Sequence, residues 1–400
     1  MVPKPAFLNR VRLANYKSIA SCDVELGPIT FLVGPNGSGK SNFLDALRFV
    51  SNSLNHSLEY SFRERGGIDE VRRRSGGHPN NFSISLELSL DGSPVKYGFH
   101  IAAKPNSDFE VRREYCEVVI GGSGQYYEVT SGIISKKSFD FGPPASADRL
   151  YLVAAAGLPQ FRALFNALSR MSFYNLNPEQ IREPQSPNPG TLLRRDGSNL
   201  ASVLKHIEKS SPGVKARIQR YLTAIVSDLH DVEYVPVGHK ETLEFRMQVD
   251  NQRYPWKFSA VSMSDGTLRA LGVLVALFQS ANGGQRAPLV GIEEPEAAVH
   301  PGAAAVLRDA LFEGIKYSQI LVTSHSPDLL DDDKIDPDSI LAVEMQHGVT
   351  AVGQLDTSRK SILRDKLFTA GDLLRQSQLT PASRVIDESK QPSLFPPESV

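Results

Sequence analysis

A glycine-rich segment at residues 34–41 constrains the fold of this chain more than any other feature of its sequence. It reads GPNGSGKS and fits the pattern G-x-x-x-x-G-K-[ST]. The apolar run at residues 29–33 predicts a buried strand before it, and residues 42–50 have helical spacing after it. In this order, backbone N–H groups and a helix N-terminus can surround a phosphate. The sequence therefore predicts a nucleotide-binding P-loop.

Composition is that of a soluble globular chain. Lys plus Arg number 44 against 45 Asp plus Glu, and 40% of the 400 residues are hydrophobic. Cys22 and Cys116 are too few for a disulfide scaffold and indicate buried thiols in a reducing compartment. The run at residues 271–278 is far shorter than the ~18 residues of a membrane span, and residues 1–12 lack a signal-peptide core. We expect a cytoplasmic protein with no membrane partner, whose neutral charge leaves only local patches for DNA.

Short strands and helices alternate along most of the chain. Strands are predicted at residues 8–14, 29–33, 232–237, 243–249, 289–292 and 320–323, with a turn at 17–21. Residues 81–130 predict an antiparallel sheet with strands at 82–90, 95–101 and 115–120. Residues 145–224 are mostly helical but are interrupted by the prolines of 183–190, and helices are expected at 267–279 and after Pro301. Buried strands that alternate with helices predict a parallel core sheet.

Two adjacent acids follow the predicted strand at residues 289–292. In a P-loop protein, acids at this edge can serve the metal and the attacking water. Because neighbouring residues of a strand point in different directions, we assign Glu293 to Mg²⁺ and Glu294 to the water. Without the P-loop, the pair would be an ordinary exposed acidic strand end.

Two further motifs lie near these acids in the sequence. His325 ends the next predicted strand and could hydrogen-bond a γ-phosphate, although a lone histidine is more often structural. Residues 261–267 (VSMSDGT) place small polar residues before a helix, which suits an anion but would also serve as a plain cap.

In their order along the chain, the motifs resemble the ABC-type ATPase heads of the SMC and RecF group, and more closely the stand-alone RecF-like ATPases of bacteria. The resemblance covers roughly residues 7–345. It implies an α/β P-loop NTPase of ABC-head type, with a mixed or parallel core sheet, an antiparallel β subdomain and an inserted helical lobe. Besides the P-loop, the resembling segments are residues 15–18 (NYKS), 42–47 (NFLDAL), 196–200 (DGSNL), 263–267 (MSDGT), 292–296 (IEEPE) with His300 and Pro301, and 323–327 (TSHSP).

The resemblance also implies how such a site is completed. In these ATPases two heads sandwich two ATP molecules, and the signature of one head touches the γ-phosphate held by the other. Ser264 and Gly266 would then act in trans on ATP bound at Lys40, which requires a homodimer or a related partner. The sequence departs from the usual pattern with Glu293 in place of Asp and Asp265 in place of Gly, and Gln160 is a candidate for the Q-loop glutamine.

We therefore expect ATP and Mg²⁺ as cofactors and an ATPase reaction. The expected catalytic residues are Glu294, Lys40 and His325, and the expected metal ligands are Ser41 and Glu293. The expected nucleotide-binding residues are Gly34, Pro35, Asn36, Gly37, Ser38, Gly39, Lys40, Ser41, Asn42, Ser264 and Gly266. The expected boundaries are residues 1–145 for the N-terminal half of the head, 146–255 for the helical insertion with returning strands, 256–360 for the C-terminal half, and 361–400 for a C-terminal helix and mobile tail.

Three biological roles follow. The first is a sensor or regulator in a bacterial antiphage defence complex with a separate effector, because the roughly 75 residues after His325 are too few for the nuclease domain of overcoming-lysogenization-defect proteins. The second is a DNA-repair ATPase that binds DNA through basic clusters at residues 72–74, 112–113 or 194–195. The third is a transporter ATPase subunit, which the roughly 224 residues between Lys40 and Ser264 disfavour.

Overall fold

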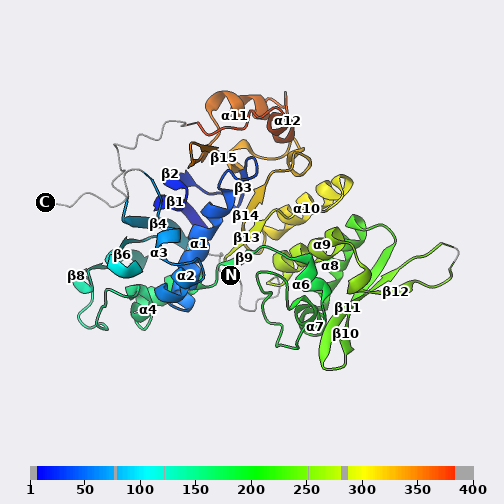
Figure 1. Ribbon diagram of the computed structural model, residues 1–400, viewed down its shortest axis with the longest axis horizontal. Helices are drawn as coiled ribbons and strands as arrows, with labels where there is room; N and C mark the ends of the chain where they lie inside the picture. Colours follow the sequence, from blue (N-terminus) through cyan, green and yellow to red (C-terminus); the bar gives the residue numbers. More distant parts are fainter. Residues whose placement is uncertain (1–6, 76–78, 121, 251, 281–286, 383–400) are drawn as a thin grey trace. The chain divides into compact units, whose positions relative to one another are not determined.

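The computed structural model describes residues 7–75, 79–120, 122–250, 252–280 and 287–382 (Figure 1). The chain forms two compact units. Unit 1 contains residues 1–171, 336–367 and 377–400, and unit 2 contains residues 172–335 and 368–376. No helix in the described ranges is long and apolar enough to cross a membrane.

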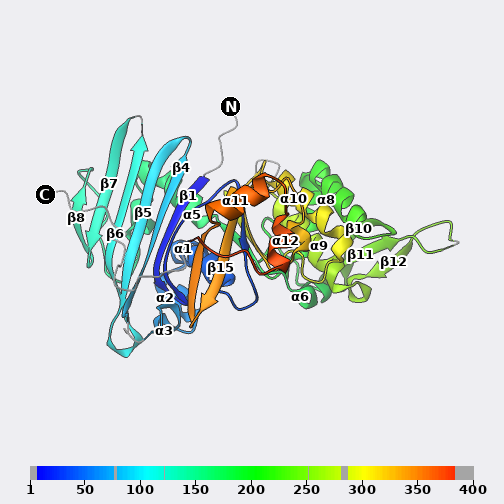
Figure 2. The ribbon, with the colours of Figure 1, turned by 90° about the horizontal axis from the view of Figure 1, so that it is seen from above.

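Unit 1 is built on a sheet whose strands follow the order β8-β7-β6-β5-β4-β1-β2-β16-β15-β3. The pairings are antiparallel except for two: β16 pairs with β2, and β15 with β3, in parallel. Figure 2 shows β7, β6, β5, β4 and β1 side by side. The strands are β1 (Phe7–Tyr16), β2 (Ile19–Glu25), β3 (Ile29–Val33), β4 (Asn81–Leu90), β5 (Ser93–Ala103), β6 (Phe109–Ile120), β7 (Ser123–Thr130), β8 (Ile133–Lys137), β15 (Ile340–Gln346) and β16 (Val349–Gln354).

Helix α1 (Lys40–Asn55) forms the centre of the core of unit 1. Its apolar residues recur at helical spacing, and the ring of Phe49 lies 5.5 Å from that of Phe82 in β4 and 5.2 Å from that of Phe62. Burial of a phenylalanine of this kind stabilises a fold by about 2–3 kcal/mol. The other helices of unit 1 are α2 (Leu58–Arg63), α3 (Ile68–Val71), α4 (Tyr151–Ala155), α5 (Pro159–Ser169) and α11 (Thr357–Arg364).

Unit 2 contains a parallel sheet and a separate antiparallel one. Strand β13 (Leu289–Glu293) pairs in parallel with β14 (Gln319–Ser324) and β9 (Ser172–Tyr174). The antiparallel sheet has the order β10 (Leu229–Val237), β11 (Lys240–Met247) and β12 (Trp256–Ser259). Helix α9 (Asp265–Phe278) is buried almost all round, as its continuous apolar sequence requires. The remaining helices are α6 (Pro178–Arg182), α7 (Leu200–Ser210), α8 (Pro212–Ile225), α10 (Ala304–Gly314) and α12 (Ala370–Arg375).

The two units divide the chain at positions other than the expected domain boundaries. Residues 256–335 belong to unit 2, whereas residues 336–367 return to unit 1 and supply β15 and β16. In the part of the expected tail that the structure describes, Leu379 and Thr380 are buried, and residues 383–400 lie outside the described ranges. Cys22 and Cys116 are free and buried, as their small number suggested.

Candidate active site

The glycines of residues 34–41 lie where two other strands of unit 1 approach the loop closely. A Cβ atom on Gly34 would lie 2.0 Å from the carbonyl oxygen of Val343 in β15. Gly39 has a φ of +101°, and a Cβ atom there would lie 2.2 Å from Oγ1 of Thr350 in β16. Contacts this short exclude any side chain. The glycine pattern is therefore required by packing as well as by the backbone approach that a phosphate needs.

Lys40 is the first residue of α1, and its side chain folds back over the loop. Its Nζ donates to the carbonyl oxygens of Gly34 and Pro35, both at 2.9 Å. Ser38 is 2% exposed, and its Oγ has no hydrogen-bond partner among the described residues. Gly39 is the N-cap and gives the helix no side-chain hydrogen bond. A buried ammonium, an unsatisfied hydroxyl and an uncapped helix N-terminus together suit an anion.

A chain of hydrogen bonds connects the P-loop to the β1–β2 turn and to strand β16. Asn42 Nδ2 donates to Ser18 Oγ at 2.7 Å, and Ser18 Oγ lies 2.7 Å from Thr350 Oγ1. Thr350 Oγ1 in turn donates to the carbonyl oxygen of Ser38 at 2.9 Å. Because Thr350 follows Ser38 by 312 residues, no local pattern in the sequence could have identified it. Ser18 lies in the resembling segment at residues 15–18, which carried no assigned role.

Asp45 fixes α1 one turn beyond the loop. Its buried carboxylate forms ion pairs with Lys17 at 2.6 Å, Arg48 at 2.7 Å and Arg65 at 2.9 Å. The hydroxyl of Tyr16 donates to it at 2.9 Å. Burial favours the neutral acid, but the cations, Arg65 foremost, outweigh it and hold the pKa of Asp45 well below its usual range. The carboxylate therefore stays ionised and ties α1 to the β1–β2 turn.

The two acids at the end of β13, in unit 2, have different partners. Arg195 Nη2 donates to Glu293 Oε1 at 2.9 Å. His325 Nδ1, directly after β14, lies 3.2 Å from Glu294 Oε1. Glu294 has a φ of +45°, an uncommon conformation for a residue with a side chain. The chain thus turns sharply after β13 and directs the second carboxylate toward His325. Sequence reasoning missed Arg195, which carried no signal beyond its place in a basic cluster.

Glu296 is a third acid on the same turn, and the sequence assigned it no role. It is 8% exposed, and Ser324 Oγ at the end of β14 donates to its Oε1 at 2.6 Å. The backbone N–H of His325 donates to the same oxygen at 3.4 Å. Burial raises the pKa of Glu296, and the hydrogen bond from Ser324 acts against this rise. Glu296 therefore joins the segment after β13 to the one that carries His325.

The signature-like segment begins helix α9. Ser264 is the N-cap, and its side chain accepts a hydrogen bond from the N–H of Thr267 at 3.3 Å. A Cβ atom on Gly266 would lie 2.1 Å from the carbonyl oxygen of Ala298, so only glycine allows this helix to pack on the segment after β13. Asp265, the departure noted above, forms an ion pair with Arg182 of α6. Within unit 2, the signature-like segment thus packs against the backbone of the segment that follows the two acids.

The expected site residues fall into two groups. Residues 34–42 belong to unit 1, whereas Ser264, Gly266, Glu293, Glu294 and His325 belong to unit 2. Gln160 lies in the first turn of α5, in unit 1. The expected basic clusters are largely compensated by acids: Arg72 pairs with Asp69, Arg74 with Glu70, Arg113 with Glu128 and Arg195 with Glu293.

The residues of the P-loop fit a nucleotide phosphate. Unsatisfied Ser38 Oγ, the glycine cradle and Lys40 supply donors and positive charge in unit 1. The described residues contain no group of three or more His, Cys, Asp or Glu that could hold a metal by itself. Mg²⁺ is commonly bound through one or two protein oxygens together with phosphate oxygens. Ser41 in unit 1 offers an exposed hydroxyl, and Glu293 in unit 2 offers a carboxylate.

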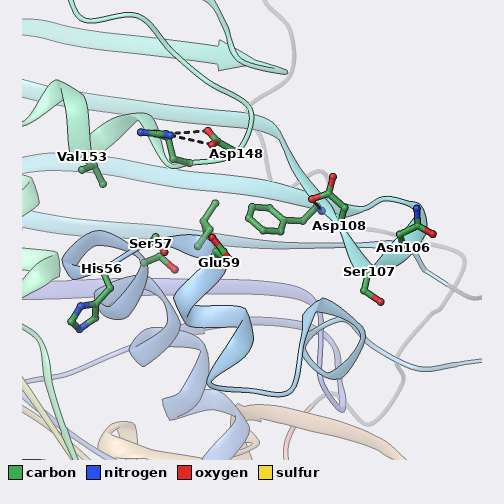
Figure 3. A pocket seen from close by; sticks show the side chains of 12 residues that line it. His56, Ser57, Glu59, Asn106, Ser107, Asp108, Asp148 and Val153 are labelled. Carbon is green, nitrogen blue, oxygen red and sulfur yellow. Dashed lines mark hydrogen bonds and ion pairs between the residues drawn. The ribbon is translucent and has the colours of Figure 1, made fainter.

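A separate pocket of about 580 Å³ lies in unit 1 (Figure 3). It contains no residue of the motifs above. Asp148 and Arg149 at its edge form an ion pair at 3.0 Å, which the figure shows. The residues that line it are Ser53, His56, Ser57, Leu58, Glu59, Asn106, Ser107, Asp108, Phe109, Asp148, Arg149 and Val153.

A P-loop on a mixed sheet, a signature helix and acids at the end of a parallel strand define an ABC-head type of P-loop ATPase. The chain belongs to the family described as "AAA domain, putative AbiEii toxin, Type IV TA system", which matches residues 29–331. The resemblance to the RecF and SMC group and the α/β ABC-head fold are both confirmed.

Curated relatives match short stretches of the chain. The DNA replication and repair protein RecF of Porphyromonas gingivalis (strain ATCC 33277) is 35% identical over 92 residues, which are 22% of this chain and 25% of that protein. The chromosome partition protein Smc of Halothermothrix orenii is 32% identical over 124 residues, 28% of this chain and 10% of that protein. The OLD nuclease of Thermus scotoductus is 41% identical over 56 residues, 14% of this chain and 10% of that protein. The matched stretches span a quarter or less of these relatives.

Solved structures support the fold. An Smc head bound to the C-terminal winged-helix domain of ScpA aligns with a TM-score of 0.56 at 15% identity and covers 88% of this chain and 99% of its own. The Smc head with an extended coiled coil from Pyrococcus furiosus, bound to the C-terminal domain of ScpA, aligns with a TM-score of 0.55 at 11% identity and covers 90% of this chain and 99% of its own.

Proposed function

We propose that this protein binds ATP at its P-loop and hydrolyses it in a site completed by a second head. The preformed anion cradle supports the proposal best: Lys40 and Ser38 are both buried, and the Oγ of Ser38 is unsatisfied within the described ranges. When phosphates bind, the Nζ of Lys40 exchanges its two carbonyl acceptors for phosphate oxygens. Mg²⁺ would supply charge neutralisation of the phosphates, with the hydroxyl of Ser41 and the carboxylate of Glu293 as its protein ligands.

The remaining roles fall to residues of unit 2. Glu294 accepts a proton from the attacking water, since its carboxylate is partly exposed and lies at the end of a core strand. His325 would orient that carboxylate: its Nδ1 lies 3.2 Å from Glu294 Oε1, although the two atoms form no hydrogen bond in the state described. In a closed dimer, Ser264 and Gly266 at the N-terminus of α9 would face the γ-phosphate held by the second head. A single chain would then turn over ATP only as a homodimer or with a related partner.

The substitution Lys40→Ala tests the proposal. It removes the cation that meets the phosphates, so we expect nucleotide affinity to fall at least tenfold in isothermal titration calorimetry. Lys136→Ala, at a side chain that is 60% exposed, is the matched control and should bind like the wild type. Unchanged affinity in Lys40→Ala would place the nucleotide elsewhere.

For the biological role, we propose a sensor or regulator that works with a separate effector in bacterial defence. The family description, which names a toxin of a type IV toxin–antitoxin system, supports this role. The second candidate is a DNA-repair ATPase, which the likeness to a protein named for DNA replication and repair supports. The compensated basic clusters give direct DNA contact little support. Isolation from the native host with and without nuclease treatment separates the two, since a nuclease-resistant protein partner supports defence and nuclease-sensitive DNA supports repair.

A further inference from the structure

Two oppositely charged side chains in unit 2 each have a buried atom that lacks a hydrogen-bond partner among the described residues. One is Oε2 of Glu296, whose other oxygen accepts from Ser324. The other is Nε of Arg269 on helix α9. Neither atom has a hydrogen bond to any residue in the described ranges. Buried polar atoms of this kind are rare in folded proteins, and each requires a physical explanation.

Arg269 lies on the face of α9 that packs against the segment after β13, residues 294–298. It follows Gly266 by three residues, which places both on one helix face, and Gly266 packs on Ala298. The carboxylates of Glu294, Glu296 and Asp265 all attract the guanidinium. Asp265 is already paired with Arg182. Burial nevertheless dominates and lowers the pKa of Arg269, and its Nε has no hydrogen-bond acceptor among the described residues in this state.

We infer that Arg269 and Glu296 are positioning residues that form an ion pair when the signature helix engages ATP. The inference rests on the proposed function. It adds a connection within one chain between the signature helix α9 and the proposed catalytic base Glu294. In the state described, Glu296 already holds the N–H of His325, and His325 faces Glu294. Movement of α9 toward its ligand would bring Arg269 onto the free oxygen of Glu296. That ion pair fixes the turn carrying Glu294 only in the engaged state. Because the contact is present in one state and absent from the other, ATP binding can shift the equilibrium toward the engaged state.

The test compares Arg269→Gln and Glu296→Gln with the wild type. Gln at position 296 keeps an acceptor for Ser324, so this variant should fold normally. We expect ATP to bind several-fold more weakly than to the wild type, because the pair stabilises only the engaged state, and kcat to fall about tenfold in each single variant. The double variant should lose no more than the worse single variant, because the two residues act through one bond. Arg269→Lys, which retains the charge, should recover part of kcat, and Arg220→Gln, at an exposed arginine paired with Glu313, is the matched control.

A second measurement does not depend on turnover. In a Glu294→Gln background, which stops hydrolysis, ATP should raise the melting temperature less when Arg269 is Gln than when it is Arg. Without nucleotide, Arg269→Gln should melt at or above its parent, since it removes a buried N–H group that lacks an acceptor in this state. A wild-type kcat in Arg269→Gln, or single losses that multiply in the double variant, would overturn the inference. Failure of the proposed function looks different, because the wild type would then show neither ATP binding nor turnover.

Discussion

Glu294 differs from its neighbour Glu293 in backbone and in surroundings. Its φ of +45° is held by a hydrogen bond from its own N–H to the carbonyl oxygen of Thr323 at 3.0 Å. Glu293 remains in β13 and pairs with Arg195. Strain of about 1–3 kcal/mol at a single residue persists only where surrounding structure imposes it. Here it separates the two carboxylates and leaves the side chain of Glu294 partly exposed.

The substitution Glu294→Gln should separate ATP binding from hydrolysis. Gln has the same shape but cannot accept the proton of the attacking water, so we expect kcat to fall by a factor of about 100 or more while ATP still binds. Phosphate release and nucleotide titration on the same preparation measure both quantities. Glu59→Gln, at an exposed acid of α2, serves as the control. Turnover at the wild-type rate would assign the base to another residue.

Residues that belong to a contiguous motif could be predicted from the sequence, whereas residues whose partners lie far away in the chain could not. The spacing of residues 34–41 and the acids after β13 could be found because each motif is contiguous. Thr350, Arg195 and Arg269 could not, since each acts on a residue far away in the chain. Only the fold brings such pairs together.

Strand β6 contains a charged residue on its buried face. Residues 114, 116 and 118 alternate inward, and Glu114 is 0% exposed. Its carboxylate accepts hydrogen bonds from the hydroxyls of Tyr97 and Tyr127 and from the N–H groups of Tyr151 and Leu152. These bonds join the sheet to the start of α4. Burial outweighs them and raises the pKa of Glu114 to about 7.

This burial predicts a pH dependence of stability. The folded state holds a proton on Glu114 that the unfolded chain, with a pKa near 4.5, has lost. Protonated Glu114 therefore makes its full contribution to the free energy of unfolding below about pH 4.5. This contribution declines as the pH rises to about 7 and amounts to on the order of 3 kcal/mol. Urea unfolding at pH 5 and pH 8 should show a smaller loss of stability with pH in Glu114→Gln than in the wild type. Glu117→Gln, exposed on the same strand, should retain the wild-type slope.

Elements were predictable where burial leaves a pattern in the sequence. Strands β13 and β14 are buried on both faces and read as short continuous apolar runs, so their positions agree with the prediction to within a residue or two. Strand β9 has three residues, too few for any period, and lies in a stretch expected to be mostly helical. The predicted turn at residues 17–21 is shorter in the structure, because β2 already begins at Ile19.

For the whole molecule, the proposed cycle requires two heads. Ser264 is exposed at the N-terminus of α9, so Ser264→Arg adds a bulky cation to the face that would meet the second head. We expect this variant to bind ATP as a monomer but not to dimerise. Analytical ultracentrifugation of Glu294→Gln with and without the added Ser264→Arg, each with ATP, measures this. Exposed Ser210→Arg at the end of α7 is the matched control. An ATP-dependent dimer that tolerates Ser264→Arg would exclude the signature from the interface.

The return of residues 336–367 to unit 1 affects the order in which the protein can be made. The ribosome produces Ser38 312 residues before Thr350, but Gly34 packs against Val343 and the carbonyl oxygen of Ser38 accepts from Thr350. Until those residues leave the exit tunnel, the loop lacks the strands that shape it. The nascent chain therefore carries an unfinished phosphate cradle until Val343 and Thr350 have been synthesised, and the complete cradle forms only after that.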